Sequence, residues 1–189
     1  MNIIARENRY TPEDLLTMPD GDRFELVDGQ LVERSVSLWS SYVAGRVNFL
    51  ITAYARPNQL GWPLPEGATY QCFPTEPNKV RKADFSFILL KRMTPAAAME
   101  KGHIRIAPDL AVEVVSPNDL YYEVDTKVQE WLGAGVRLLW IINPDARTVR
   151  VYRADGSDAS KRAEDEISGE DVVPGFCCRV REFFELPSE

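Results

Sequence analysis

Residues 104–136 read IRIAPDLAVEVVSPNDLYYEVDTKVQEWLGAGV, and the fold we expect is built around this stretch. Side chains of residues 109–115 alternate with period two, which predicts a strand carrying Glu113 among small and branched apolar neighbours. After Ser116 and Pro117 the apolar side chains recur at helical spacing and form one stripe. That stripe consists of Leu120, Val124, Val128, Trp131 and Leu132.

Lys127 projects from the middle of this apolar stripe, between Leu120 and Trp131. One explanation is snorkelling, in which the stem of the lysine is buried and its ammonium reaches water. The other is a buried partner, because a helix that follows a strand through a short loop packs back on the sheet. Lys127 and Glu113 are therefore expected to face one another as a buried ion pair.

The composition is that of an ordinary globular chain. Its 189 residues are 44% hydrophobic and 27% charged, which suits one domain with a sizeable core. Charged residues near the N-terminus and the lack of an apolar run of about 18 residues predict neither a signal peptide nor a membrane span. We therefore expect a cytoplasmic protein. Three cysteines without a C-x-x-C pair, and the single His103, predict neither zinc nor a disulfide framework.

The net charge of −7 is concentrated in residues 155–171. This segment holds seven acidic and two basic residues, so it carries −5 and leaves −2 for the rest of the chain. Its Gly and Ser content predicts a solvated acidic surface loop. Outside it there is still no basic surface of the kind expected for tight nonspecific binding of nucleic acid.

The N-terminal half predicts a helix, a hairpin and a long helix. Thr11 and Pro12 begin a short helix that ends near Pro19, and Asp28-Gly29 is a turn favoured between twisted antiparallel strands. The remaining elements expected here are hairpin strands over residues 23–27 and 30–34, a helix over 36–55, and a strand near 68–73 that prolines place at an edge.

The C-terminal half predicts mixed strands and helices. Residues 84–90 alternate, with Phe85 and Phe87 on one face and Asp84 on the other. The apolar run at 138–142 predicts the centre of the sheet. The other elements are a short surface helix over 94–101, an alternating strand over 148–153 and a closing element over 176–184.

Asp84 and Glu113 thus lie on separate strands of one sheet. Neighbouring carboxylates repel at short range, which recruits a cation. Mg²⁺, with Mn²⁺ as the alternative, prefers carboxylate oxygens, a backbone carbonyl and water. With the Lys127 ammonium, this set provides the groups needed for metal-assisted phosphodiester hydrolysis.

Four motifs make this chain resemble a known family. They are ELVDG at 25–29, KADFSF at 82–87, APDLAVEVVSP at 107–117, and AGV at 134–136 followed by LWIINP ending at Pro144. Together they look like the Uma-type restriction-endonuclease-like family of the PD-(D/E)XK superfamily, over residues 10–152. The resemblance implies an α/β fold with a mixed sheet flanked by helices, over one domain spanning residues 1–189.

The resemblance also implies a site. Asp84 corresponds to the metal aspartate, Glu113 to the acid of the E-x-K element with the Val114 carbonyl beside it, and Glu25 to an additional acid. The pattern requires lysine where this chain has Val115. Lys127, on the following helix, fills that place. The implied activity is Mg²⁺-dependent cleavage of duplex DNA.

Two other functions stay open. One is an inactive DNA-binding or protein-interaction module of the same fold, and the other is hydrolysis of a different phosphoester. We also expect a homodimer. Its contacts would come from the helix carrying Trp39, Tyr42 and Leu50 and from the proline-rich edge near Trp62.

Several side chains have a purely structural interpretation as well. Asp109 is expected to mark the entry of its strand, and Glu25 to pair with Arg23 or Arg34 as an alternative to a metal role. His103 is expected in an exposed loop. Trp131 and Trp140 are predicted core residues. On a helical wheel, Asp125 and Gln129 point away from the apolar stripe.

Overall fold

A computed structural model describes residues 9–33 and 36–187, and its centre is a six-stranded mixed sheet of order β10-β9-β8-β7-β6-β3. The predicted α/β class and mixed sheet are confirmed. Strands β7 and β8 are parallel and form the middle of the sheet, while every other neighbouring pair is antiparallel. The strands are β3 (Gly61–Pro65), β6 (Phe85–Leu89), β7 (Leu110–Val114), β8 (Leu138–Asn143), β9 (Thr148–Arg153) and β10 (Asp158–Arg162).

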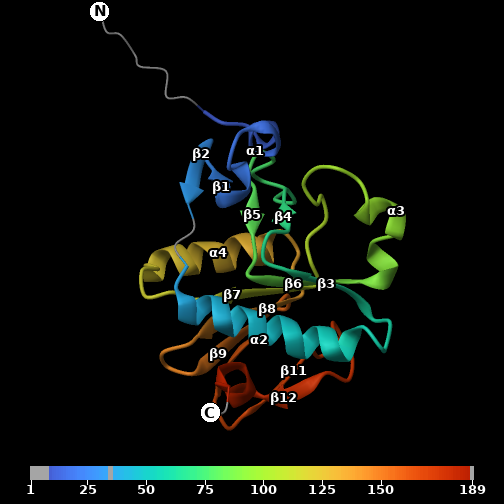
Figure 1. The fold of residues 1–189 in the computed structure, drawn as a ribbon, viewed down its shortest axis with the longest axis vertical. Helices are drawn as coiled ribbons and strands as arrows, with labels where there is room; N and C mark the ends of the chain where they lie inside the picture. Colours follow the sequence, from blue (N-terminus) through green and yellow to red (C-terminus); the bar gives the residue numbers. More distant parts are fainter. Residues whose placement is uncertain (1–8, 34–35, 188–189) are drawn as a thin grey trace, which may run out of the picture.

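Helices cover both faces of this sheet. Figure 1 shows α2 (Leu38–Ala55) on one side and α4 (Tyr121–Gly133) on the other. The alternation along β7 explains the division, because Leu110 and Val112 enter the core under α2 while Ala111 enters the core that holds Trp131 of α4. Glu113 shares the face of Ala111, so it points toward α4, as its period-two position predicts.

The long helix α2 begins two residues later than predicted. Ser37 is its N-cap, and the Ser37 hydroxyl accepts a hydrogen bond from the Ser40 amide. The helix ends at Ala55, before Pro57, as predicted.

The predicted hairpin is confirmed as β1 (Phe24–Val27) and β2 (Gln30–Glu33). Asp28 and Gly29 both have positive φ, 53° and 79°, which is the conformation of a type I′ turn. The hairpin follows α1 (Pro12–Thr17) and η1 (Gly21–Arg23) and lies on the α4 side of the sheet in Figure 1. Residue 34, where the second strand was expected to end, and the charged residues within 1–8 lie outside the described residues.

A small second sheet joins the hairpin to the main one. It pairs β4 (Thr69–Tyr70) with β5 (Arg81–Lys82), and Leu26 of the hairpin exchanges backbone hydrogen bonds of 2.9 Å with Val80. The hairpin is therefore fixed to the segment that leads directly into β6.

The strand predicted near residues 68–73 is confirmed as β4, but it is not the edge strand of the main sheet. The edge of the main sheet is β3, which contains Pro63 and Pro65, while β4 comprises only Thr69 and Tyr70. An edge strand tolerates proline because one of its sides has no neighbour that needs the missing N–H.

The prediction that residues 155–171 form a loop was also wrong, since they contain β10 and β11 (Glu166–Ser168). Strand β10 alternates exposed and partly buried residues at the sheet edge, where charge discourages pairing with other chains. Strand β12 (Cys177–Arg179) and η3 (Val180–Phe184) close the core beside α2, as expected for the last element.

The remaining elements are η2 (Leu90–Arg92) and α3 (Pro95–Ala98), the latter within the predicted surface helix. In the part of the chain that the structure describes, no helix is both long and apolar enough to cross a membrane. The cytoplasmic location stays a prediction.

Candidate active site

Asp84 and Glu113 line the same cavity, whose volume is about 390 Å³. Because β6 runs antiparallel to β7, the residue before β6 lies beside the end of β7. The Asp84 amide donates to the Val112 carbonyl at 3.0 Å, and the Val114 amide donates to Asp84 Oδ2 at 2.6 Å. These two hydrogen bonds fix Asp84 beside the strand that carries Glu113.

Helix α4 donates to both carboxylate oxygens of Glu113. Lys127 Nζ donates to Oε2 at 3.2 Å, and Trp131 Nε1 donates to Oε1 at 2.9 Å. Residues four apart lie on one face of a helix, so both donors reach the same carboxylate. The predicted Lys127–Glu113 pair is thereby confirmed. The Glu113 side chain is 8% exposed and that of Lys127 is 23% exposed, so Lys127 is both paired and partly open to the cavity it lines.

Glu25 also lines the cavity and is 1% exposed. Its Oε2 accepts from Arg81 Nη1 at 2.8 Å, and its Oε1 accepts from the Lys82 amide at 2.8 Å. The proposed pairing of Glu25 with Arg23 was wrong, because Arg23 pairs with Glu33 on the next strand. Arg34, the other proposed partner, lies outside the described residues.

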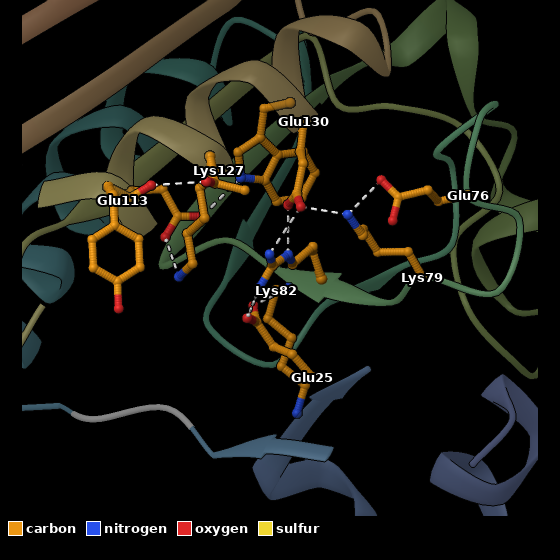
Figure 2. A network of polar contacts seen from close by, with 11 residues as sticks. Glu25, Glu76, Lys79, Lys82, Glu113, Lys127 and Glu130 are labelled. Atoms are coloured by element: carbon orange, nitrogen blue, oxygen red, sulfur yellow. Dashed lines mark hydrogen bonds and ion pairs between the residues drawn. The ribbon is translucent and has the colours of Figure 1, made fainter. Parts of the chain in front are cut away.

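Arg81 connects the hairpin to α4 through Glu25 and Glu130, which Figure 2 labels. While Nη1 bonds Glu25, its Nε and Nη2 donate to the two oxygens of Glu130 on α4 at 2.7 and 3.0 Å. Burial lowers the pKa of Arg81, but the two carboxylates outweigh burial and hold this pKa above its ordinary value. A charged, two-sided bridge therefore joins the hairpin that carries Glu25 to the helix that carries Lys127.

The same network continues away from the cavity. Lys79 donates to Glu130 and, at 2.6 Å, to Glu76, so Glu130 accepts from two cations. Lys82 directs its ammonium to the backbone carbonyl of Asp22, below the hairpin. Sequence reasoning missed this network because bonded members lie up to 60 residues apart and follow no common period.

His103 is buried, and the prediction of an exposed loop position was wrong. It is 7% exposed, with Nε2 2.8 Å from the Pro12 carbonyl and Nδ1 2.9 Å from Thr69 Oγ1. A carbonyl can only accept, so Nε2 carries a proton and His103 fixes the start of α1 to β4. His103 does not line the cavity.

Asp109 lies at the opposite end of β7 from Glu113. It is fully buried, accepts from the Leu89 amide at 2.9 Å, and faces Arg92 at 3.0 Å and Arg137 at 3.4 Å. It is therefore a structural residue at the entry of its strand, as expected.

Trp131 and Trp140 are buried core residues as predicted. Asp125 and Gln129 are exposed, in agreement with the helical wheel.

The donor set at Asp84 and Glu113 suits a hard divalent cation. Within the described ranges no group of three or more His, Cys, Asp or Glu side chains is arranged to hold a metal ion. Mg²⁺ commonly uses only one or two carboxylates and keeps several waters. In a strand, one residue directs its N–H and C=O to the same side, so the Val114 carbonyl faces the side of Asp84, to which its N–H donates. Two carboxylates and this carbonyl fit Mg²⁺.

Comparison with known proteins gives a family and a fold. The family model "Uma2: Putative restriction endonuclease" matches residues 12–181. A crystal structure of "a putative nuclease belonging to DUF820 from Anabaena variabilis ATCC 29413" is similar, with a TM-score of 0.75 and 19% identity over 92% of this chain and 97% of that chain. At this identity the likeness supports the fold. No curated protein matches the chain.

Proposed function

This chain belongs to the Uma2 family, described as "Putative restriction endonuclease", and from that premise we propose that it is a Mg²⁺-dependent DNA endonuclease. One observation carries the proposal. Two carboxylates, Asp84 and Glu113, and one ammonium, Lys127, line a single cavity at the ends of adjacent strands. These groups are the ones that hydrolysis of a phosphodiester requires.

In this proposal Asp84, Glu113 and the Val114 carbonyl hold the ion, with Mn²⁺ as an alternative to Mg²⁺. The bound ion supplies Lewis acidity, polarising a phosphoryl oxygen and lowering the pKa of water. The protein contributes fixed oxygens, since the Val114 amide holds Asp84 and α4 holds Glu113. A carboxylate oxygen has two lone pairs, so the donors on Glu113 leave it able to bind an ion.

Lys127 supplies positive charge where negative charge develops on the phosphate. Its contact with Glu113 at 3.2 Å fixes the ammonium beside the proposed ligands, and the side chain, which is 23% exposed, lines the cavity. A preorganised charge of this kind stabilises a transition state without reorganising during the reaction.

Trp131 and Glu25 are positioning residues in this account. Trp131 fixes the orientation of Glu113 through its indole N–H, as outer partners of metal ligands generally do. Glu25 acts through Arg81 and Glu130, and Glu130 follows Lys127 by three residues on α4. The network therefore holds the helical turn that presents Lys127.

One observation favours an inactive module as the second candidate. Both Glu113 oxygens already accept hydrogen bonds, so this carboxylate is stabilised without an ion. In such a module the acids and Lys127 would persist because they hold α4 on the sheet.

Thermal unfolding and cleavage, each measured in EDTA, Mg²⁺ and Mn²⁺, separate these functions. A nuclease gains melting temperature with the ion, because ligands of the folded state stabilise it, and cleaves plasmid or oligonucleotide DNA. Cleavage of bis(p-nitrophenyl) phosphate without cleavage of DNA would indicate the third candidate, a hydrolase of another phosphoester. The nuclease proposal would be contradicted if the ions neither raised the melting temperature nor supported cleavage.

We further propose that residues 1–189 form one domain and that the chain is a homodimer, since closed two-fold symmetry is the commonest form of oligomer. Trp39 and Leu50, expected as contacts, pack on the core of their own chain, and Trp62 donates to the Met93 carbonyl at 2.9 Å. The exposed apolar side chains of α2 are Leu38 and Phe49. Light scattering that gives a monomer at micromolar concentration would remove the dimer.

A further inference from the structure

The cavity that Asp84 and Glu113 line is also lined by apolar side chains. Its walls come from the hairpin side, from the sheet and from the first turns of α4, and its apolar lining residues are Val27, Val32, Val36, Val114, Val115, Tyr122, Val124 and Ile141. Three of them are unusually open for their type, with Val32 at 39%, Val36 at 52% and Tyr122 at 64% exposure. Exposed apolar groups gathered in a cavity mark a surface that contacts a ligand.

The size of this cavity restricts the ligand. A volume of about 390 Å³ lies at the lower end of the range of small-molecule sites, which suits one nucleotide. A base in an intact duplex is stacked and paired, so it reaches such a pocket only when it is extruded or already unpaired.

Charge limits how strongly this cavity can bind phosphates. The chain as a whole carries −7, and among the described residues the cavity is lined by six acidic and two basic side chains. Neutralisation of phosphates by lysine and arginine, which dominates binding of duplex DNA, is therefore a weak source of affinity here. Stacking of bases on aromatic side chains is the alternative source, and it acts on unpaired strands.

We propose that the cavity takes one unpaired nucleotide, with its base on Tyr122 and the valines and its phosphodiester at Asp84, Glu113 and Lys127. The substrate class is then single-stranded, flapped or otherwise unpaired DNA, in place of the intact duplex expected from the sequence. This inference rests on the proposed nuclease function for its catalytic half, while the base pocket is testable by binding alone.

Tyr121 provides the matched control for Tyr122. It is the preceding residue and is 86% exposed, but it does not line the cavity. Binding of a fluorescent single-stranded oligonucleotide is measured by anisotropy in Ca²⁺, a hard cation with the same preference for oxygen ligands. Tyr122→Ala should raise the Kd for the oligonucleotide about 10-fold, which is the scale of one lost stacking contact. Tyr121→Ala should stay within about twofold, and Tyr122→Phe should bind like the wild type because the ring is kept.

Cleavage of the same oligonucleotide, single-stranded or annealed, completes the test in Mg²⁺ and Mn²⁺. The inference predicts that the single strand is cut at least about 10-fold faster than the duplex, and that removing the base next to the cut site protects the bond. It is overturned if the duplex is cut faster, or if Tyr121→Ala and Tyr122→Ala have equal effects. It is also overturned if Tyr122→Ala dissociates a dimer while DNA binding is unchanged, because a second copy would then occupy the pocket.

Failure of the proposed function would look different. If the wild type binds unpaired DNA through Tyr122 but cuts no DNA with either ion, the base pocket is supported and the nuclease proposal fails. If it cuts duplex preferentially, the nuclease proposal is supported and the base pocket fails.

Discussion

Lys127 Nζ lies 3.2 Å from Glu113 Oε2, and this contact joins α4 to strand β7 of the sheet. The two residues are 14 positions apart in the sequence. The Glu113 side chain is 8% exposed and that of Lys127 is 23% exposed, so the pair is nearly buried on one side and open to the cavity on the other. Because Trp131 also donates to Glu113, this carboxylate keeps one partner if Lys127 is changed. The consequences for catalysis and for stability can therefore be separated.

Lys127→Met tests the role of the ammonium. Methionine keeps much of the apolar stem, and Glu113 keeps its bond from Trp131, so the free energy of unfolding should fall by only about 1 to 2 kcal/mol. Single-turnover cleavage should fall by a factor on the order of 10² to 10³, the range for losing one preorganised charge. Thermal unfolding and quenched-flow cleavage of the same sample measure both effects. A folded variant that cuts at the wild-type rate would refute the assignment.

Trp131→Phe tests whether the indole positions Glu113. Loss of this hydrogen bond should weaken Mn²⁺ affinity about 10- to 100-fold, the scale seen when an outer partner of a ligand is removed. Trp140→Phe is a matched control, because Trp140 is buried in the other core and its Nε1 has no hydrogen-bond partner among the described residues. Calorimetric titration with Mn²⁺ should separate the two variants. If Trp131→Phe and Trp140→Phe bind Mn²⁺ with equal affinity, the Trp131 indole only packs in the core and does not position Glu113.

Arg81→Met tests the bridge between the hairpin and α4. It leaves the buried Glu25 and Glu130 without their shared cation, which should cost about 3 to 5 kcal/mol and lower the melting temperature by roughly 10 °C. Arg23→Met is the control, since the Arg23–Glu33 pair is more than half exposed and should change stability by less than about 1 kcal/mol. Similar melting temperatures for the two variants would show that the bridge contributes little.

The sequence predicted the centre of the site because periodicity reports which face a residue occupies. Glu113 at a period-two position and Lys127 within a helical stripe had to meet if α4 packed on β7, and they do. Asp84 could be placed at the start of its strand for the same reason.

Other features carried no periodic signal. Arg81, Glu25 and Glu130 meet through tertiary packing over 49 and 56 residues, and His103 is buried by a carbonyl and a hydroxyl from distant segments. The acidic segment appeared to be a loop because β10 and β11 are edge strands, whose charged side chains hide the alternation.

The three thiols report on the fold independently of function. Burial raises the pKa of both Cys72 and Cys178 to about 12, whereas Cys177 is exposed. Burial raises the pKa of Cys177 as well, but this thiol is exposed, so it should react with a thiol reagent at pH 8 faster than the other two. For Cys72 the pKa is about 12 in the folded protein and 9.0 in the unfolded chain, so folding favours the protonated thiol. This contribution to the free energy of unfolding is complete below pH 9 and is lost as the pH rises toward 12. The stability of the protein should therefore fall above pH 9. Rapid labelling of all three thiols in the native protein would contradict this packing.

The most direct test of the central claim is the single-turnover rate of DNA cleavage as a function of Mg²⁺ concentration, for the wild type and for Asp84→Asn. Asp125→Asn serves as the control, because Asp125 is exposed on α4. We predict a rate that is zero in EDTA and saturates with Mg²⁺ for the wild type and the control. Asp84→Asn should fold normally and lose at least on the order of 10² in rate, since a hard ligand is missing. Cleavage by Asp84→Asn at the wild-type rate and the same Mg²⁺ concentration would contradict the account.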